Sequence, residues 1–191
     1  MYHFLYFFIA ITLTILMLTK VTVNHNLIKV ISTKDNIEYV VRDLSNSHIA
    51  ANKLAGINTK VLLLINNLNE NRKGVNKLKS KYNPKTLSET EKGSIHTSYS
   101  VNKGERISLC IRNKDDDSFI ENDNVIIFVM IHELAHIMTE SIGHTKEFWD
   151  NMKFLLEEAN KLNIYTPIDY SINNMDYCGM IIKSTPYDFK K

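Results

Sequence analysis

Residues 125–144 read VIIFVMIHELAHIMTESIGH, and this stretch decides both the fold and the chemistry of the chain. Seven apolar residues stand ahead of the pattern H-E-x-x-H at positions 132–136. A run that is apolar nearly all round is typical of a helix buried in a core. Side chains that can cap its N-terminus precede it, at Asn122, Asp123 and Asn124. We therefore predict a buried helix over Val125–Thr139.

His132 and His136 stand four residues apart, so both imidazoles face the same side of the predicted helix. Two imidazoles spaced in this way can bind one zinc ion, and Glu133 can reach a metal-bound water. The pattern indicates a zinc hydrolase in which the histidines are ligands and Glu133 is the general base. The same letters also occur by chance in a purely structural helix, and the buried apolar run favours the metal site.

Catalytic zinc usually has three protein ligands and one open position for water. His144 is the preferred third ligand, because Gly143 just before it can end the helix and let the chain turn back. On an unbroken helix, His144 would lie about 12 Å beyond His136 along the axis, out of reach of the same ion. Glutamates are the alternatives, and those on the following helix are the stronger rivals. The candidates are Glu140, Glu157 and Glu158.

A second helix is expected directly after His144. Thr145 or His144 can cap its N-terminus, and Glu147 in its first turn suits the positive end of the helix dipole. Apolar residues recur at steps of four and three and form one stripe, which Trp149 widens. We predict that Phe148 and Trp149 belong to the core behind the metal helix. The stripe consists of Phe148, Met152, Leu155, Ala159 and Leu162.

These motifs together resemble the WLM and SprT-like zinc metallopeptidases. The resemblance is carried by H-E-L-x-H at residues 132–136, by Gly143-His144 and by Phe148-Trp149. It implies a minimal peptidase fold, with a helix before a small sheet, then the metal helix and a second helix. Many relatives place the third histidine six residues after the second, whereas here the gap is eight, a departure that concerns the loop and leaves the ligand type unchanged.

The C-terminal part of the chain points to one subgroup of this family. The runs YTPIDY at residues 165–170 and YCGM at residues 177–180 are similar to those of WLM-domain proteins encoded by large double-stranded DNA viruses. The resemblance extends over roughly residues 98–186, about half of the chain. It also implies that an edge strand beside the metal helix receives the substrate backbone, and Ile107–Arg112 is the candidate.

The N-terminal segment is the second strong signal in the sequence. Phe4–Leu18 contains no charged residue, and Tyr2–Thr19 is just long enough to cross a hydrocarbon core of about 30 Å. A cleaved signal peptide is the rival interpretation, but no Lys or Arg precedes the run and no A-x-A pattern follows it. We predict an uncleaved transmembrane anchor over residues 1–23, with a buried N-terminal helix as the remaining alternative.

Positive charge lies after the anchor, so the positive-inside bias predicts a single-pass membrane protein with its catalytic domain on the cytoplasmic side. Cys110 and Cys178 fit that side, because two cysteines are too few for a disulfide framework and we interpret them as buried thiols. The basic residues that follow the anchor are Lys20, Lys29, Lys34 and Arg42.

The formal net charge of the chain is only +2, which argues against a polyanion-binding molecule as a whole. Six basic residues nevertheless gather within residues 72–85. They form either a phosphate-facing patch or the solvated face of a helix, and the second interpretation is favoured because charge runs usually solvate a helix. The cluster consists of Arg72, Lys73, Lys77, Lys79, Lys81 and Lys85.

The remaining pattern predicts an α+β fold over residues 24–191, a mainly helical, zincin-like domain with a small antiparallel sheet. Apolar spacing predicts a helical layer over residues 35–82, with a short helix around residues 37–44 and a longer one over residues 49–68. Alternating residues on both sides of Asn102-Lys103-Gly104 predict a hairpin. The further expected segments are the hairpin over 94–112, the metal helix over 123–142, the second helix over 145–162 and the C-terminal tail over 163–191.

These observations predict a membrane-anchored zinc metallopeptidase that hydrolyses a protein or peptide substrate with Glu133 as general base. Its second oxyanion donor is expected among Tyr165, Tyr170 and Tyr177, and the sequence selects none of them.

Two other functions stay open. One is a membrane-tethered interaction protein with a structural or vestigial zinc site, for which Cys178 or Glu140 can supply a fourth ligand. The other is a DNA-associated protease of the WLM or SprT type, in which Lys77, Lys79 and Lys81 bind phosphate. The sequence leaves the oligomeric state open.

Overall fold

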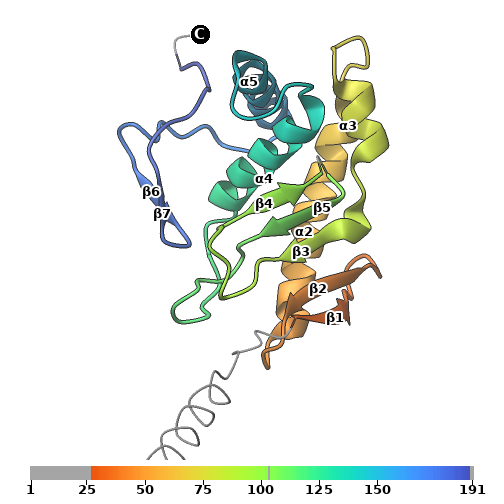
Figure 1. The fold of residues 1–191 in the computed structure, drawn as a ribbon, viewed down its shortest axis with the longest axis vertical. Coiled ribbons are helices and arrows are strands. Elements are labelled where there is room, and N and C mark those ends of the chain that lie inside the picture. The colour runs from red at the N-terminus through yellow and green to blue at the C-terminus, as the bar shows by residue number, and fades with distance from the viewer. Residues whose placement is uncertain (1–26, 103, 190–191) are drawn as a thin grey trace, which may run out of the picture.

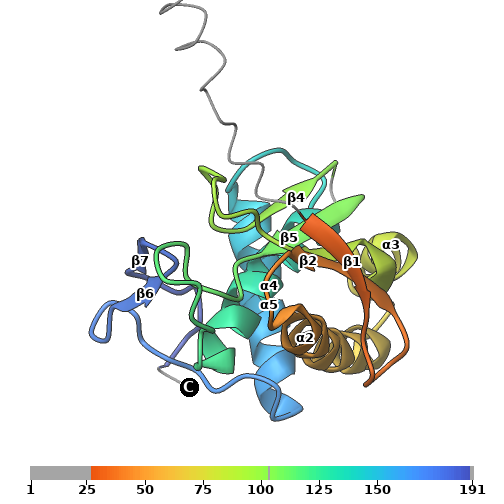
Figure 2. The same ribbon diagram turned by 90° about the horizontal axis from the view of Figure 1, so that it is seen from below.

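A mixed five-stranded sheet, covered on one face by helices, forms the body of the molecule (Figures 1 and 2). This computed structural model describes residues 27–102 and 104–189. Within them the elements are β1 (Leu27–Ile31), β2 (Glu38–Arg42), α2 (Ser47–Asn67), α3 (Val75–Lys81), the short 3-10 helix η1 (Pro84–Thr86), β3 (Leu87–Glu89), β4 (Tyr99–Val101), β5 (Arg106–Leu109), α4 (Asp123–Met138), α5 (Lys146–Lys161), β6 (Met175–Tyr177) and β7 (Met180–Ile182).

The strands of the main sheet lie in the order β1-β2-β3-β5-β4. The outer pairs β1–β2 and β4–β5 are antiparallel, whereas β2–β3 and β3–β5 are parallel. Parallel neighbours need a crossover connection, and α2 with α3 supplies the one between β2 and β3. The α+β class is confirmed, but the expectation of a small antiparallel sheet holds only for the outer pairs.

The predicted hairpin is confirmed, with β4 paired to β5 from Tyr99 opposite Ser108 to Val101 opposite Arg106. The expected substrate strand is wrong. β5 lies between β3 and β4, so both of its edges are already paired, and β4 is the edge strand beside α4. The reason is the parallel pairing of β3 with β5, a long-range contact that no local pattern announces.

The helix expected around residues 37–44 is wrong, because this segment forms β2. Its apolar spacing fits a helical period by coincidence. In the structure Tyr39 and Val41 are fully buried, whereas Val40 between them is half-buried, which is the two-residue alternation of a strand. The helix predicted over residues 49–68 is confirmed as α2 and packs against β1, β2 and β3.

The metal helix and the helix after it are both confirmed. The side chain of Asn122 caps α4 by accepting a hydrogen bond from the backbone N–H of Asn124, and Thr145 caps α5 by accepting from Phe148. α4 covers the β4–β5 half of the sheet, and α5 packs along α4 (Figure 2). α4 ends at Met138, earlier than the expected residue 142, and the chain is extended at Thr139.

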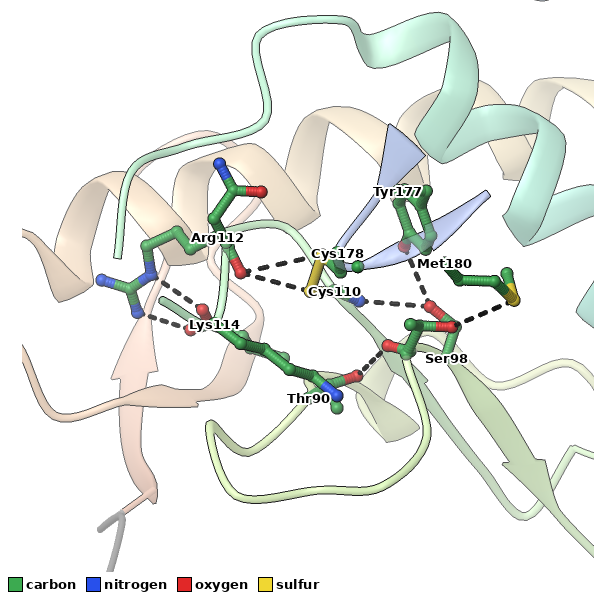
Figure 3. Close-up of a disulfide and its surroundings, with 12 residues drawn as sticks. Thr90, Ser98, Cys110, Arg112, Lys114, Tyr177, Cys178 and Met180 are labelled. Carbon is green, nitrogen blue, oxygen red and sulfur yellow. Dashed lines mark hydrogen bonds and ion pairs between the residues drawn. A yellow bond between two sulfur atoms is a disulfide. The ribbon is translucent and has the colours of Figure 1, made fainter. Parts of the chain in front are cut away.

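Cys110 and Cys178 form a disulfide bond, so the interpretation of two buried thiols is wrong (Figure 3). The bond joins the residue after β5 to the turn between β6 and β7, and it links positions 68 residues apart. Only the folded-back C-terminal hairpin brings the two sulfur atoms together. Disulfides are typical of oxidising compartments, so the cysteines no longer support the predicted cytoplasmic side.

A buried ionic cluster, absent from the predictions, fastens the sheet near this disulfide. The carboxylate of Glu89 at the end of β3 accepts hydrogen bonds from Arg42 Nε at 2.7 Å and Arg112 Nε at 2.7 Å. Glu89 and Arg112 are fully buried, and Arg42 also binds Asp117 in the loop after β5. The cluster thus joins β2, β3 and the segment that follows β5.

The predicted membrane anchor over residues 1–23 lies outside the described residues. Within residues 27–102 and 104–189, no helix combines the length and the apolar character needed to cross a bilayer.

The disulfide should contribute strongly to stability. In the chain-entropy model, a disulfide that closes a loop of 68 residues lowers the entropy of the unfolded chain and thereby raises the free energy of unfolding by about 4 kcal/mol. The double variant Cys110→Ser, Cys178→Ser should therefore unfold at a clearly lower denaturant concentration than the wild type. Urea unfolding followed by circular dichroism measures the difference, and the wild type in reductant should match the double variant. Identical curves with and without reductant would contradict the linkage.

Candidate metal centre

Three imidazoles meet where α4 ends and the chain returns towards α5. His132 Nε2 lies 3.2 Å from His136 Nε2 and 3.1 Å from His144 Nε2. Tetrahedral zinc with bonds of about 2.0–2.1 Å places two ligand atoms roughly 3.3 Å apart. The three nitrogens are therefore spaced as ligands of one small metal ion. The structure brings together the three residues predicted as ligands.

His132 has the proton state that a ligand needs. Burial, together with the neighbouring rings of His136 and His144, lowers the pKa of His132 to about 3. The ring is neutral at physiological pH, so it keeps a lone pair that can bind a metal.

The loop between the two helices places His144. Thr139 Oγ1 donates to Ala135 O at 2.7 Å at the end of α4, and Gly143 then adopts a φ of +81°. Ser141 ties the loop to α5, because its hydroxyl lies 2.6 Å from Thr145 Oγ1. The chain reverses within a few residues, which removes the axial distance that an unbroken helix would impose.

Glu147 in the first turn of α5 fastens this loop from the other side. Its carboxylate accepts hydrogen bonds from the backbone N–H of Ser141 at 3.2 Å and from Ser141 Oγ at 3.0 Å. These bonds, followed by the nearby Lys73 ammonium, lower the pKa of Glu147 to about 2. Glu147 is thus a positioning residue for the loop that carries His144.

Helix α3 supports the same loop from the outside. Gly74 at its start approaches so closely that an added Cβ would lie 2.5 Å from Met138 O. Lys77 Nζ donates to Thr139 O at 2.9 Å and pairs with Glu140 at 3.1 Å, while Lys73 pairs with Glu147 at 3.3 Å. Of the basic cluster, Lys77 therefore binds the ligand loop itself and Lys73 binds the α5 residue that fastens it. Whether the cluster also binds nucleic acid stays a prediction.

Phe148 packs its ring against all three imidazoles on the buried side of the candidate metal centre. Its ring centroid lies 4.4, 4.8 and 4.7 Å from those of His136, His132 and His144, and its side chain is fully buried. The predicted core position is confirmed for Phe148. It is wrong for Trp149, which is 40% exposed and lies 5.5 Å from the ring of His144. Neighbouring residues of a helix point about 100° apart, so one aromatic ring faces inward and the other lines the cavity.

Glu133 lies in the wall of the same cavity as the imidazoles. Burial raises the pKa of its carboxyl group to about 7, and hydrogen bonds with Ser100 oppose that rise. Ser100 belongs to the edge strand β4, so this strand positions the carboxylate predicted as the general base. The sequence contained no sign of this contact, because strand pairing alone brings Ser100 to α4.

The alternative ligands lie apart from the imidazoles. Among the described residues, the cluster with metal-binding geometry contains three histidines and no carboxylate. Glu140 pairs with Lys77, and Glu158 pairs with Lys161 at 2.6 Å. Cys178 is oxidised, so it has no thiolate to offer as a fourth ligand.

The three tyrosines considered as oxyanion donors are buried outside the cavity. Tyr165 and Tyr170 pack against Phe128, with ring centroids 6.1 and 4.7 Å away. The hydroxyl of Tyr177 lies 2.9 Å from Ser98 Oγ (Figure 3). The structure therefore selects none of them.

A cavity of about 620 Å³ opens beside the imidazoles. Its lining comes from α4, α5, the loop before β4, Lys114 in the segment after β5, and the β6–β7 hairpin with the two residues that follow it. The sequence had predicted only a C-terminal tail in the region of this hairpin. The volume falls within the range of about 300–1,000 Å³ that is usual for ligand sites. The cavity includes His132, Glu133 and His144 in its wall.

Comparison with known proteins identifies the family. Residues 79–175, which contain the three histidines, match the WLM domain. The chain belongs to the WLM-domain family. It is 32% identical to Uncharacterized protein R325 of Acanthamoeba polyphaga mimivirus over 154 residues, which are 77% of this chain and 78% of the relative. It is also 37% identical to Uncharacterized protein 136R of Invertebrate iridescent virus 6 over 82 residues, or 42% of this chain and 44% of the relative.

The fold of this WLM domain resembles the crystal structure of Wss1 from Saccharomyces cerevisiae. The TM-score is 0.51 at 22% sequence identity, and the match covers 64% of this chain and 87% of that chain. The resemblance to WLM-domain proteins of large DNA viruses is confirmed. The three histidines are consistent with a metal site of the kind found in WLM zinc proteases.

Removing His144 should impair metal binding. The variant His144→Ala should weaken Zn²⁺ affinity by more than the roughly 10–100-fold that loss of an outer-shell partner costs. Metal analysis after dialysis and a competitive chelator titration measure the change. Glu157→Ala and Glu158→Ala are the controls and should keep the wild-type affinity. Unchanged metal content in His144→Ala, with loss in either control, would move the third ligand to the glutamate.

Glu147 should make stability depend on pH in a defined direction. Because its pKa in the folded chain lies below the ordinary value near 4.5, its contribution is complete above pH 4.5 and is lost as the pH falls towards 2. The melting temperature of the wild type should exceed that of Glu147→Gln at pH 7, and the difference should shrink between pH 4.5 and 2. If the difference in melting temperature between the two proteins stayed constant from pH 4.5 to pH 2, the ionised Glu147 carboxylate would not be what stabilises the loop.

Proposed function

We propose that this protein is a zinc-dependent metallopeptidase that hydrolyses peptide bonds. The observation that carries the proposal is the convergence of His132, His136 and His144 on one point, with Glu133 in the wall of the same cavity. Membership of the WLM-domain family supports it. The cluster within the described residues offers three ligands, which is the number in catalytic zinc sites, whereas a structural site needs four.

Zinc bound here would supply an activated water as nucleophile and a Lewis acid for the substrate carbonyl. Glu133 accepts the proton of the attacking water and delivers it to the leaving amine. A carboxylate with a pKa near neutrality suits both transfers, and the hydrogen bonds from Ser100 hold it towards the cavity. Phe148 keeps the inner side of the imidazoles free of water.

The edge strand β4 is proposed to receive the substrate. Within the described part of the chain, it is paired on one side only, with β5. An extended peptide that adds to this edge runs past Ser100, and therefore past Glu133. β4 replaces residues 107–112 in this role, because β5 has no free edge.

The apolar run over residues 4–18 supports the further proposal that the enzyme is held at a membrane. Cell fractionation of the full-length chain, compared with a chain that lacks residues 1–23, tests this part separately from catalysis. If alkaline carbonate released the full-length chain from the membrane fraction, residues 1–23 would not be a transmembrane anchor.

The variant Glu133→Gln should keep its zinc but lose hydrolysis. General base catalysis is worth about 10²–10⁴-fold, so cleavage of casein by the zinc-loaded, full-length variant should fall by at least about 10²-fold. Glu158→Gln is the matched control, because it makes the same chemical change on the far part of α5, where Glu158 pairs with Lys161 outside the imidazole cluster. Proteolysis by Glu133→Gln at the wild-type rate would exclude Glu133 as the base. A chelator-insensitive wild-type activity would reject the metallopeptidase itself.

A further inference from the structure

We propose that the cavity beside the imidazoles binds a large apolar side chain of an extended peptide substrate, at a residue next to the bond that is cleaved. The inference rests on the proposed peptidase function and names the substrate class of that site. The residues that would set this preference are Trp149 and Met180, with Val129 in the floor.

Exposed apolar side chains gather at this cavity. Ile95 is 91% exposed, Ile181 48%, Met180 44% and Trp149 40%, and all four belong to its lining. Apolar surface in contact with water is unfavourable, and covering it stabilises a complex by about 25 cal/mol per Å². Exposed apolar side chains that line one cavity mark a binding site.

The floor of the cavity is apolar and reaches the metal centre. Phe128 and Val129 of α4 stand about one helical turn before His132, and Met152 of α5 completes the floor. One turn is about 5.4 Å along the helix axis. An extended peptide advances about 3.3 Å per residue, so the floor lies about one to two residues from a bond cleaved at the metal centre, within reach of the side chain next to that bond.

The opposite wall is the β6–β7 hairpin, which is fixed by several ties (Figure 3). The disulfide holds Cys178 in its turn, and the Tyr177 hydroxyl lies 2.9 Å from Ser98 Oγ. Tyr177 is fully buried and Ile182 is 8% exposed, so both strands are anchored in the core. A wall held in place before binding lowers the entropy cost of taking up a side chain.

The lining contains three formally charged side chains, Lys114, Lys183 and Glu133, and none of them belongs to the apolar floor of Phe128, Val129 and Met152. The ammonium of Lys114 is directed to the loop before β4, where it donates to Ser94 O at 2.6 Å and His96 O at 2.9 Å. Glu133 is the carboxylate in the lining, and the proposed reaction uses it. A charged side chain over the floor loses hydration without a compensating partner, which is costly.

Peptides that differ at one residue test the preference. Zinc-loaded, full-length protein is given matched fluorogenic peptides with Leu, Phe, Gly, Asp or Lys next to the cleaved bond. The expected kcat/KM is at least about 10-fold higher for Leu and Phe, because one methylene in an apolar pocket is worth about 10–200-fold. Met180→Glu should remove most of this preference. The control is Ile172→Glu, since Ile172 is 77% exposed and lies outside the cavity.

Trp149 gives a second readout that does not depend on turnover. It is the one tryptophan in the sequence, so intrinsic fluorescence reports on the cavity. In the Glu133→Gln variant, the Leu and Phe peptides should shift its emission to shorter wavelength, and the Asp and Lys peptides should not. The added substitution Met180→Glu should abolish the shift, whereas added Ile172→Glu should leave it unchanged.

The two readouts separate this inference from the proposed function. Equal hydrolysis of all the peptides, unaffected by Met180→Glu, would overturn the apolar subsite and leave the peptidase standing. Absence of hydrolysis together with a selective shift of Trp149 emission would overturn the peptidase and support the binding site. Absence of hydrolysis and of any selective shift would overturn both.

Discussion

The reversal of the chain between α4 and α5 is the constraint on which the rest of the structure depends. A helix can place His132 and His136 side by side without help, because they stand one turn apart. It cannot place His144, which must return by about 12 Å. The intervening residues therefore leave the helix at Thr139, and hydrogen bonds from Ser141 to the first turn of α5 fix the new direction. The three ring nitrogens meet because several hydrogen bonds together fix the conformation of this short loop.

The other elements contact either that loop or the cavity beside it. The start of α3 approaches α4 at Gly74, Lys77 of α3 binds the ligand loop at Thr139 O, and Lys73 just before α3 pairs with Glu147 in the first turn of α5. The sheet supplies β4, whose Ser100 holds Glu133. The C-terminal hairpin closes the cavity, and the disulfide fixes it to the end of β5. Segments far apart in the sequence thus meet at one centre, and each one controls a different property: ligand geometry, orientation of the base, or the shape of the cavity.

The sequence predicted the parts of this arrangement that local geometry determines. Helical spacing identified α2, α4 and α5, and the positions of the histidines pointed to one metal ion. Contacts between distant segments had no such signature. The strand over Glu38–Arg42 imitated a helical period, the parallel pairing of β3 with β5 depends on the crossover, and Cys110 meets Cys178 only after the hairpin folds back. The contact of Ser100 with Glu133 belongs to the same class, since it exists only once β4 lies beside α4.

Phe148 and Trp149 are adjacent on one helix, yet one lies against the three imidazoles and the other lines the cavity proposed to bind substrate. The two residues are adjacent, and the sequence suggested a common place in the core for both. The turn of about 100° between neighbours of a helix directs Phe148 beneath the imidazoles and Trp149 into the cavity. Because both rings contact His144, the wall of the cavity and the ligand share the same support. A side chain that filled the space over Trp149 would also lie close to the ring of His144, so the residues proposed to bind an apolar substrate are also neighbours of the third proposed ligand.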